Sequence, residues 1–166
     1  DPTNPREDDI DIRDIAHALS MMTRANGHFT EFYSVARHSV NCALEATARG
    51  YSKRVALFCL LHDSAESYIG DMTRPLKMHF PLFSEYEKKL QKVIFSKYAT
   101  LDIAEDEKEK VKSVDDSLLY HEFLCYHGDK LFDFTPEIHI DVKDNSKNIS
   151  ETEKEFLCMY EALKIK

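Results

Sequence analysis

Apolar residues recur at three- and four-residue spacing along most of the chain, which is the period of an amphipathic α-helix. The glycines fall at breaks between the apolar segments, as helix stop signals do. The pattern predicts an all-α protein with about six helices, at residues 11–21, 30–49, 53–69, 84–99, 104–127 and 150–164. Ser84 with Glu87 and Ser150 with Glu153 have the spacing of capping boxes, so Ser150 is predicted to start the last helix.

Two segments depart from this pattern. Residues 1–10 carry two prolines and four acidic residues, which favours an extended N-terminal arm over a helix. Residues 129–149 combine Pro136 with alternating apolar and polar positions, which predicts a long loop with room for a short strand at residues 137–142. Since the chain contains no linker-like tract or internal repeat, a single domain over residues 1–166 is expected.

The composition narrows the classes of partner. The 166 residues include 22 Lys and Arg against 30 Asp and Glu, a formal charge of −8, which argues against binding to a nucleic acid polymer through its phosphates. No apolar run approaches the roughly 18 residues that span a membrane. The sequence shows no signal-peptide pattern, so a cytoplasmic protein with reduced thiols is expected. The cysteines are Cys42, Cys59, Cys125 and Cys158.

The most informative stretch lies at residues 55–70. Seven consecutive apolar residues predict a helix with no exposed face, and His62, Asp63 and Glu66 follow directly. Burying an unpaired carboxylate costs several kcal/mol, so this cluster requires a cation or a dense hydrogen-bond network. A metal ion meets that requirement, although two adjacent ligands do not complete a site.

Further donors are expected from two other helices. His38 shares an apolar stripe with Cys42, and Asp115 and Asp116 lie within an apolar helical segment where one of them should face inward. Taken singly, a buried histidine is more often a hydrogen-bonded core residue, and a buried acid often pairs with Lys or Arg. Taken with His62 and its neighbouring acid, the three segments predict one site.

The order H…HD…D resembles the signature of the HD-domain phosphohydrolase superfamily. The blocks that carry the resemblance are DIAHALS (14–20), Arg24, GH (27–28), YSVARHSV (33–40), LLHDSAESYIGDMTRPLK (60–77) and VKSVDD (111–116). In order and spacing they are similar to the small single-domain branch related to bacterial HD 5′-nucleotidases. The resemblance implies an HD-domain helical bundle.

The resemblance also implies a ligand set for one divalent ion: His38, His62, Asp63 and Asp115. The alignment of VKSVD favours Asp115 over Asp116. Two imidazoles and two carboxylates suit Mn²⁺, Co²⁺, Fe²⁺, Ni²⁺ or Zn²⁺ and are less typical of Mg²⁺. Of these ions, Mn²⁺ or Co²⁺ would fit what the resemblance implies.

Catalytic roles carry over in the same way. Glu66 would orient or deprotonate the attacking water, unless it caps a helix or pairs with Arg74. Asp71 would donate a proton to the leaving oxygen or hold a sugar hydroxyl. The phosphate-binding candidates are Arg24, His28, Arg74 and Lys77. The chain has no tryptophan that could shape a sugar pocket near Arg24, so selectivity for deoxyribose is not implied.

The expected function is a metal-dependent phosphohydrolase that removes phosphate from a small nucleotide, a nucleoside 5′-monophosphate, through a metal-activated water. One alternative is hydrolysis of a nucleoside di- or triphosphate or of a signalling nucleotide such as guanosine tetraphosphate. Another is a regulatory metal-binding module without chemistry. Proteins of the family that the chain resembles often pair as dimers, and Phe156, Leu157 and Tyr160 could serve a homodimer or could equally close the monomer core; the residues alone do not decide the oligomeric state.

Overall fold

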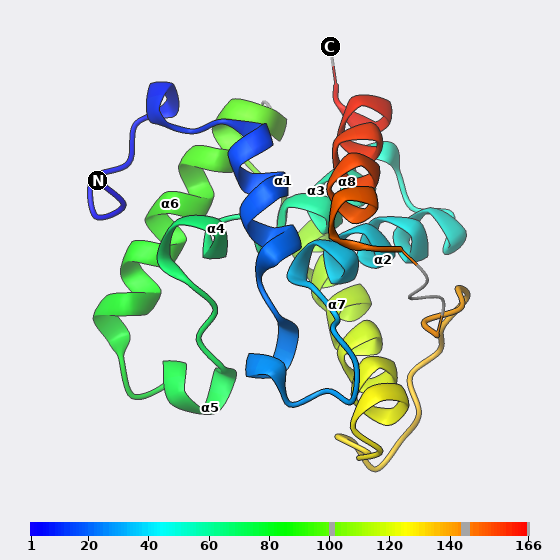
Figure 1. Cartoon of the computed structure of the whole chain (residues 1–166). Coiled ribbons are helices and arrows are strands. Elements are labelled where there is room, and N and C mark those ends of the chain that lie inside the picture. Colours follow the sequence, from blue (N-terminus) through cyan, green and yellow to red (C-terminus); the bar gives the residue numbers. More distant parts are fainter. Residues whose placement is uncertain (100–101, 144–146, 166) are drawn as a thin grey trace.

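Helices joined by loops make up the fold (Figure 1). The structure is a computed structural model that describes residues 1–99, 102–143 and 147–165. Within these ranges it contains eight α-helices, two short 3-10 helices and no β-strand, which confirms the all-α prediction. The elements are η1 (Glu7–Asp9), α1 (Ile12–Met21), η2 (Arg24–Gly27), α2 (Val35–Ala48), α3 (Lys53–Leu61), α4 (Glu66–Ile69), α5 (Arg74–Lys77), α6 (Pro81–Ala99), α7 (Glu105–Tyr126) and α8 (Ile149–Leu163).

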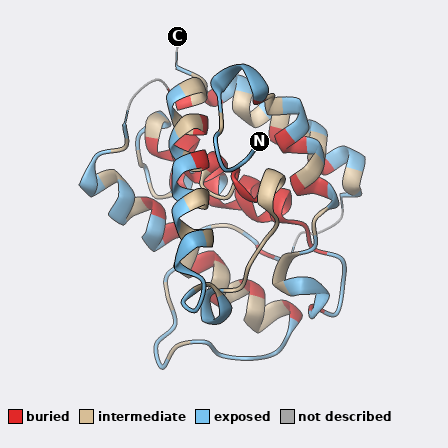
Figure 2. Cartoon of the chain, turned by 90° about the vertical axis from the view of Figure 1, so that its left-hand side faces the viewer, coloured by how far each residue is buried: buried red, intermediate tan, exposed pale blue. Residues whose placement is uncertain are grey.

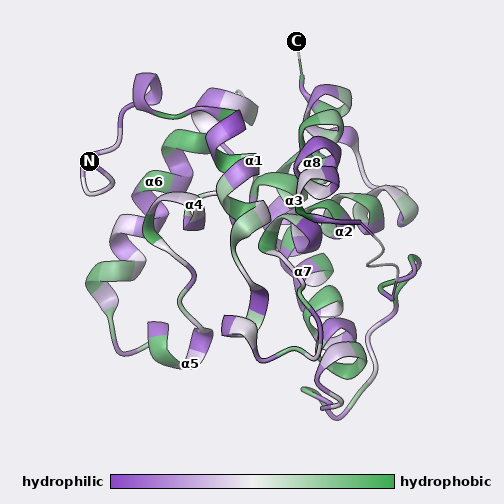
Figure 3. Ribbon diagram, in the orientation of Figure 1, coloured by the Kyte–Doolittle hydropathy of each residue, from purple (hydrophilic) through white to green (hydrophobic). Residues whose placement is uncertain are grey.

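Helix α3 forms the centre of the hydrophobic core. Every side chain at residues 55–61 is buried, and the helix packs against α2, α6, α7 and α8. Buried residues gather in the interior in Figure 2, and α3 is strongly hydrophobic in Figure 3. The helix begins where the Ser52 hydroxyl accepts a hydrogen bond from the Val55 amide, 3.2 Å away. The expected helix without an exposed face is therefore present.

The prediction of one continuous helix at residues 53–69 is wrong, because α3 ends at Leu61 and α4 begins only at Glu66. Between them the chain makes tight turns, in which the Ser64 amide donates to the Leu61 carbonyl and the Glu66 amide to the Asp63 carbonyl. The break places His62 and Asp63 at the point where a buried helix stops. Two neighbouring side chains can converge there, whereas on a continuous helix they would diverge by about 100°.

Three other helix starts differ from the prediction. Helix α2 begins at Val35 rather than at residue 30, because an antiparallel bridge joins Thr23 to Ser34 and the Ser34 hydroxyl then caps the helix. Helix α6 begins at Pro81, so Ser84 lies inside it and caps nothing. The short helix α5 was not predicted.

Helix α8 has a capping box, but two residues earlier than expected. The Asn148 side chain accepts from the Glu151 amide at 3.0 Å, and the Glu151 carboxylate accepts from the Asn148 amide at 2.9 Å. Ser150 therefore lies inside the first turn. Both pairs have the same spacing, and asparagine at the earlier position is as good a cap as serine.

The segment after α7 is irregular wherever it is described, at residues 127–143 and 147–148, and the short strand expected at residues 137–142 is absent. Its alternation nevertheless has a structural basis, because Ile138, Ile140 and Val142 pack against the core. Without a partner strand they form no ladder. The segment is held instead by side chains, such as the Tyr126 hydroxyl, which donates to the Val142 carbonyl at 2.9 Å.

The N-terminal segment expected to be an extended arm contains the single turn of η1. It is attached to α6, whose Lys97 ammonium donates to the carbonyls of Glu7 at 2.7 Å and Ile10 at 2.6 Å. At the other end of the chain, Phe156 on α8 is fully buried in the core, with Leu157 and Tyr160 packed beside it. Over the described residues, no helix combines the length and the apolar character needed to cross a bilayer.

Candidate metal centre

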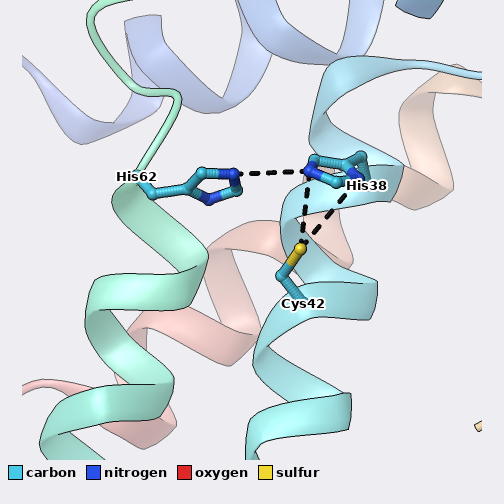
Figure 4. Close-up of side chains that lie close together, drawn as sticks. All are labelled: His38, Cys42 and His62. Atoms are coloured by element: carbon cyan, nitrogen blue, oxygen red, sulfur yellow. Dashed lines mark hydrogen bonds between the residues drawn. The ribbon is translucent and has the colours of Figure 1, made fainter. Parts of the chain in front are cut away.

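His38 and His62 approach each other from α2 and from the end of α3 (Figure 4). Their Nε2 atoms are 3.3 Å apart. The His62 Nδ1 lies 2.7 Å from the Cys59 carbonyl, and the His38 Nδ1 lies 2.6 Å from a Glu122 carboxylate oxygen. Both partners can only accept, so each Nδ1 carries a proton and each ring turns its Nε2 toward the other. Two Nε2 atoms at this distance share either a proton or a metal ion, so the pair is a site for a positive charge.

Two carboxylates adjoin the imidazole pair. The Asp63 Oδ2 is 3.3 Å from the His62 Nε2 and 3.8 Å from the His38 Nε2. The Asp115 Oδ1, from α7, is 3.2 Å from the His38 Nε2 and 3.8 Å from the His62 Nε2. Ligands held about 2.0–2.2 Å from one ion lie about 3 Å or slightly more from one another. The spacing of these donor atoms therefore fits a single metal ion.

Cys42 offers another donor to the same imidazoles. Its Sγ is 3.4 Å from the His38 Nε2, and His38, Cys42 and His62 together form a group that could hold a metal ion. Burial raises the pKa of the Cys42 thiol well above its ordinary value, which keeps it protonated and makes it a poor ligand. For Asp115, burial raises the pKa, but contacts with His38 and His62 outweigh burial and hold the pKa well below its ordinary value. This carboxylate therefore stays charged. The donor chemistry thus favours the carboxylates over the thiol.

The electrostatics around His62 also favour a cation. Burial would lower the pKa of this imidazole, but Asp63 and Asp115 raise it to about 9. The two carboxylates thus stabilise a positive charge at the Nε2 atoms. A metal ion bound at the Nε2 atoms would supply this positive charge in place of a proton.

Glu122 is a buried residue of the site that the sequence pattern did not identify. Its carboxylate accepts from the His38 Nδ1 at 2.6 Å, the Arg24 Nε at 2.9 Å and the Tyr33 hydroxyl at 3.0 Å. Burial raises the pKa of Glu122, but the nearby His38 and Arg24 lower it below its ordinary value. The only sequence signal was one acid among apolar and aromatic residues of α7.

Arg24 enters the site from a strained loop. Ala25 and Asn26 both have φ of 51° and Gly27 has φ of 78°, so three successive residues are left-handed. For Ala25 this conformation costs about 1–2 kcal/mol, whereas asparagine and glycine adopt it more readily. The guanidinium binds Glu122 and lies 3.5 Å from the Asp63 Oδ2 and 3.6 Å from the Asp115 Oδ1. The strained loop thus places a permanent positive charge beside the donor atoms.

Glu66 and Asp71 line the same cleft as Asp63. Glu66 is only 6% exposed, and its Oε2 has no hydrogen-bond partner among the described residues. Burial, and then the charges of Asp63 and Asp71, raise the pKa of the Glu66 carboxyl. Burial also raises the pKa of Asp71. An unpartnered buried carboxyl that faces a cleft is suited to exchange a proton with a bound molecule.

The remaining predicted phosphate ligands occupy the rim of the site. Arg74 binds Asp115 at 2.5 Å and Asp116 at 3.0 Å, so it reaches the donor set from α5. Lys77 is paired with Glu87 of α6 at 2.6 Å, and His28 is exposed. Asp116 also pairs with Lys112, whereas Asp115 is the α7 acid whose carboxylate lies next to the imidazoles.

A cleft of about 730 Å³ adjoins the donor atoms of Asp63 and Asp115. Figure 1 shows η2, α5 and the C-terminal end of α7 at the same end of the molecule. The lining includes the predicted residues Arg24, His28, Asp63, Glu66, Asp71, Arg74, Lys77 and Asp115. It also includes apolar and aromatic residues that no motif indicated: Leu119, Phe123, His127, Leu131 and Phe132. The cleft therefore has a charged part and an apolar part.

Comparisons with known proteins give partial matches. No protein-family model matches the chain. It is 40% identical over 92 residues to the uncharacterized protein YfdR of Escherichia coli, across 55% of this chain and 49% of that protein. An uncharacterized protein of Rhodobacter capsulatus is 44% identical over 82 residues, 46% of this chain and 41% of its own length. The 5′-deoxynucleotidase yfbR of Photorhabdus temperata is 30% identical over 95 residues, 51% of this chain and 48% of that protein.

The chain thus spans about half, or slightly less, of the length of each of these relatives. One of the three names states an enzymatic activity, that of a 5′-deoxynucleotidase. The matched part suggests a hydrolase, and the His38, Cys42 and His62 group is consistent with a bound divalent metal.

Proposed function

We propose that the protein is an HD-type metal-dependent phosphohydrolase that removes phosphate from a nucleoside 5′-monophosphate. The observation that carries the proposal is the pair of imidazole Nε2 atoms, 3.3 Å apart, with Asp63 and Asp115 oxygens beside them. The partial likeness to a 5′-deoxynucleotidase supports the same reaction class.

The ligands of a divalent ion would be His38, His62, Asp63 and Asp115, a mixed nitrogen and oxygen set that suits Mn²⁺ or Co²⁺. Such an ion, when bound, lowers the pKa of a water ligand and neutralises charge on a phosphoryl oxygen. The protein holds both imidazoles in the required tautomer before any ion arrives, through the Cys59 carbonyl and Glu122. This arrangement reduces the reorganisation needed on binding.

The phosphate would be held by the fixed positive charges that border the donor set. Arg24 is the best placed, because its guanidinium is buried and already oriented by Glu122. Arg74 would turn from Asp115 to the phosphate, and Lys77 would add a third charge at the rim. Phosphoryl transfer depends chiefly on such positioning and charge stabilisation.

Glu66 and Asp71 would handle the protons. In its ionised form Glu66 can accept a proton from the attacking water at its free Oε2, and Asp71, which lines the same cleft, can in its protonated form protonate the leaving oxygen. Water is the nucleophile, the bond from phosphorus to the ester oxygen breaks, and the products are a nucleoside and inorganic phosphate.

The test is phosphate release from nucleoside mono-, di- and triphosphates by metal-stripped protein supplied with Mn²⁺, Co²⁺, Ni²⁺, Zn²⁺ or Mg²⁺. Asp115→Asn should abolish release. Asp116→Asn is the matched control, because this neighbouring acid pairs with Lys112 and Arg74 instead of the imidazoles, and it should keep most of the activity. Release from monophosphates that is lost only with Asp115→Asn supports the proposal. Release from di- or triphosphates alone would move the substrate class, and metal binding without hydrolysis of any nucleotide would favour a regulatory module.

A further inference from the structure

The thiol of Cys42 lies beside the two imidazoles of the centre, and the proposed chemistry does not use it (Figure 4). Cys42 follows His38 by four residues on α2, so both side chains project from one face of the helix. The Cys42 Sγ is 3.4 Å from the His38 Nε2, and the donor atoms of His38, Cys42 and His62 all lie within 4.8 Å of one another. Because Cys42 is only 1% exposed, its sulfur faces these rings and not solvent.

The distances fit a tetrahedral ion that has a sulfur ligand. Nitrogen ligands at about 2.0–2.1 Å and a sulfur ligand at about 2.3 Å place two nitrogens about 3.3 Å apart, and nitrogen and sulfur about 3.5 Å apart. The two Nε2 atoms are 3.3 Å apart, and the Cys42 Sγ is 3.4 Å from the His38 Nε2. The Asp115 Oδ1, 3.2 Å from the His38 Nε2 and 3.8 Å from the His62 Nε2, supplies a further donor. Two sets of four donors therefore share the imidazoles and Asp115, and they differ in the fourth ligand, which is Asp63 in one set and Cys42 in the other.

The chemistry of the ion decides between the two sets. Mn²⁺ prefers oxygen ligands and six-coordinate geometry, so it takes Asp63 and keeps positions open for water and phosphate. Zn²⁺ is softer, binds thiolate readily and is satisfied by four protein ligands in a closed tetrahedral site. The neutral Cys42 thiol is a poor ligand for Mn²⁺, whereas coordination to Zn²⁺ displaces the thiol proton, which passes to water. A closed set of four protein ligands leaves no position for the attacking water.

We infer that Zn²⁺ binds at this centre with Cys42 in place of Asp63 as a ligand, and that this Zn²⁺ form is inactive. The inactivity rests on the proposed function, whereas the sulfur ligand does not. Cys42 is then a selectivity residue, through which the centre distinguishes a thiophilic ion from Mn²⁺. Zn²⁺ is an inhibitor of the Mn²⁺ form.

X-ray absorption spectroscopy tests the sulfur ligand without catalysis. Protein with one equivalent of Zn²⁺ should show one sulfur at about 2.3 Å, besides nitrogen and oxygen at about 2.0–2.2 Å. Protein with one equivalent of Mn²⁺ should show no sulfur ligand. Cys42→Ser should lose the zinc-bound sulfur, and Cys42→Ala repeats the test if serine disturbs the core. Cys59→Ser is the matched control, because this thiol on α3 is similarly buried and is not part of the donor group.

Calorimetry and kinetics measure the consequences for the ion. Losing an outer partner of a ligand lowers metal affinity about 10- to 100-fold, so losing the thiolate itself should weaken Zn²⁺ binding by at least about tenfold. Zn²⁺ added to the Mn²⁺ form should stop phosphate release. In Cys42→Ser the half-inhibitory Zn²⁺ concentration, measured against that variant's own Mn²⁺ rate, should rise by the same factor as the dissociation constant of Zn²⁺.

The outcomes separate this inference from the proposed function. A Zn²⁺ spectrum without sulfur, or equal Zn²⁺ affinity in wild type and both Cys42 variants, would overturn the inference and leave the phosphohydrolase intact. Phosphate release with Zn²⁺ at the Mn²⁺ rate would refute the inactive form. If no ion supports hydrolysis, but the zinc-bound sulfur is present in wild type and absent in Cys42→Ser, the proposed reaction fails and the zinc site stands.

Discussion

Replacing Glu122 by glutamine keeps the size of the side chain and removes a buried negative charge. The wild-type carboxylate accepts hydrogen bonds from His38, Arg24 and Tyr33 at 2.6–3.0 Å, and it is fully buried. The glutamine amide has only one oxygen that can accept hydrogen bonds, and it carries no negative charge to balance the Arg24 guanidinium. Breaking a buried ion pair in this way costs about 3–5 kcal/mol. With a urea slope of about 1–3 kcal/mol per molar, the unfolding midpoint should fall by at least 1 M.

The same change should weaken metal binding. Glutamine can also donate to the His38 Nδ1, so the imidazole is no longer held in the tautomer that bares its Nε2. Losing such an outer partner lowers metal affinity by about 10- to 100-fold. Mn²⁺ binding by calorimetry, and urea unfolding in chelator, measure the two effects separately.

Glu45→Gln is the matched control for Glu122→Gln. Glu45 is equally buried and accepts from Arg49 at 2.7 Å and from the His139 Nδ1 at 2.9 Å, away from the metal site. Glu45→Gln should lower the free energy of unfolding by a comparable amount and leave the Mn²⁺ affinity unchanged. The reasoning is refuted if Glu122→Gln binds Mn²⁺ as wild type does, or if both variants lose affinity equally.

Three further predictions follow from the contacts described above. Cys42→Ser should leave Mn²⁺ affinity within a few-fold of wild type while Asp115→Asn reduces it at least tenfold in calorimetry, and the opposite ranking would make the thiol the ligand. Arg74→Ala should raise KM for the nucleotide several-fold without weakening Mn²⁺ binding, because its guanidinium competes for Asp115; steady-state kinetics and calorimetry check this. Burial raises the pKa of Glu45, but hydrogen bonds from Arg49 and His139 outweigh it and hold the pKa below its ordinary value of 4.5. The ionised carboxylate therefore stabilises the fold above pH 4.5 and loses this effect as the pH falls through the lower folded value. The free-energy difference between wild type and Glu45→Gln should therefore shrink on acidification, and a constant difference from pH 7 to 3 would contradict the ion pairing.

The sequence was sufficient to predict the helical class and the residues that meet at the candidate metal centre. His62 and Asp63 stand out because they interrupt an apolar run, and Asp115 stands out within an apolar helix. Their convergence is seen in the structure, whereas their roles stay predictions. The helix break after Leu61 was not predictable, because apolar spacing continues through residues 65 and 69.

Other parts of the site were hidden because they look like ordinary core or surface. Glu122 lies between a histidine and a phenylalanine on α7, and only the fold shows that it faces His38. Leu119 and Phe123 have the spacing of core residues, and Phe132 lies in a loop that has no regular pattern. Sequence periodicity shows which face of a helix is apolar, but not whether that face meets another helix or an open cleft.

The donor atoms of the candidate centre come from α2, from the end of α3 and from α7, which are far apart along the chain. An ion bound to all of them would close two long loops, much as a covalent cross-link does, and closing a loop of tens of residues restricts the unfolded chain by about 3–4 kcal/mol. Amide hydrogen exchange should then slow together in these three helices when metal is added. Helix α6 contributes no donor, so metal would slow exchange only at those α6 amides that exchange when the whole protein unfolds.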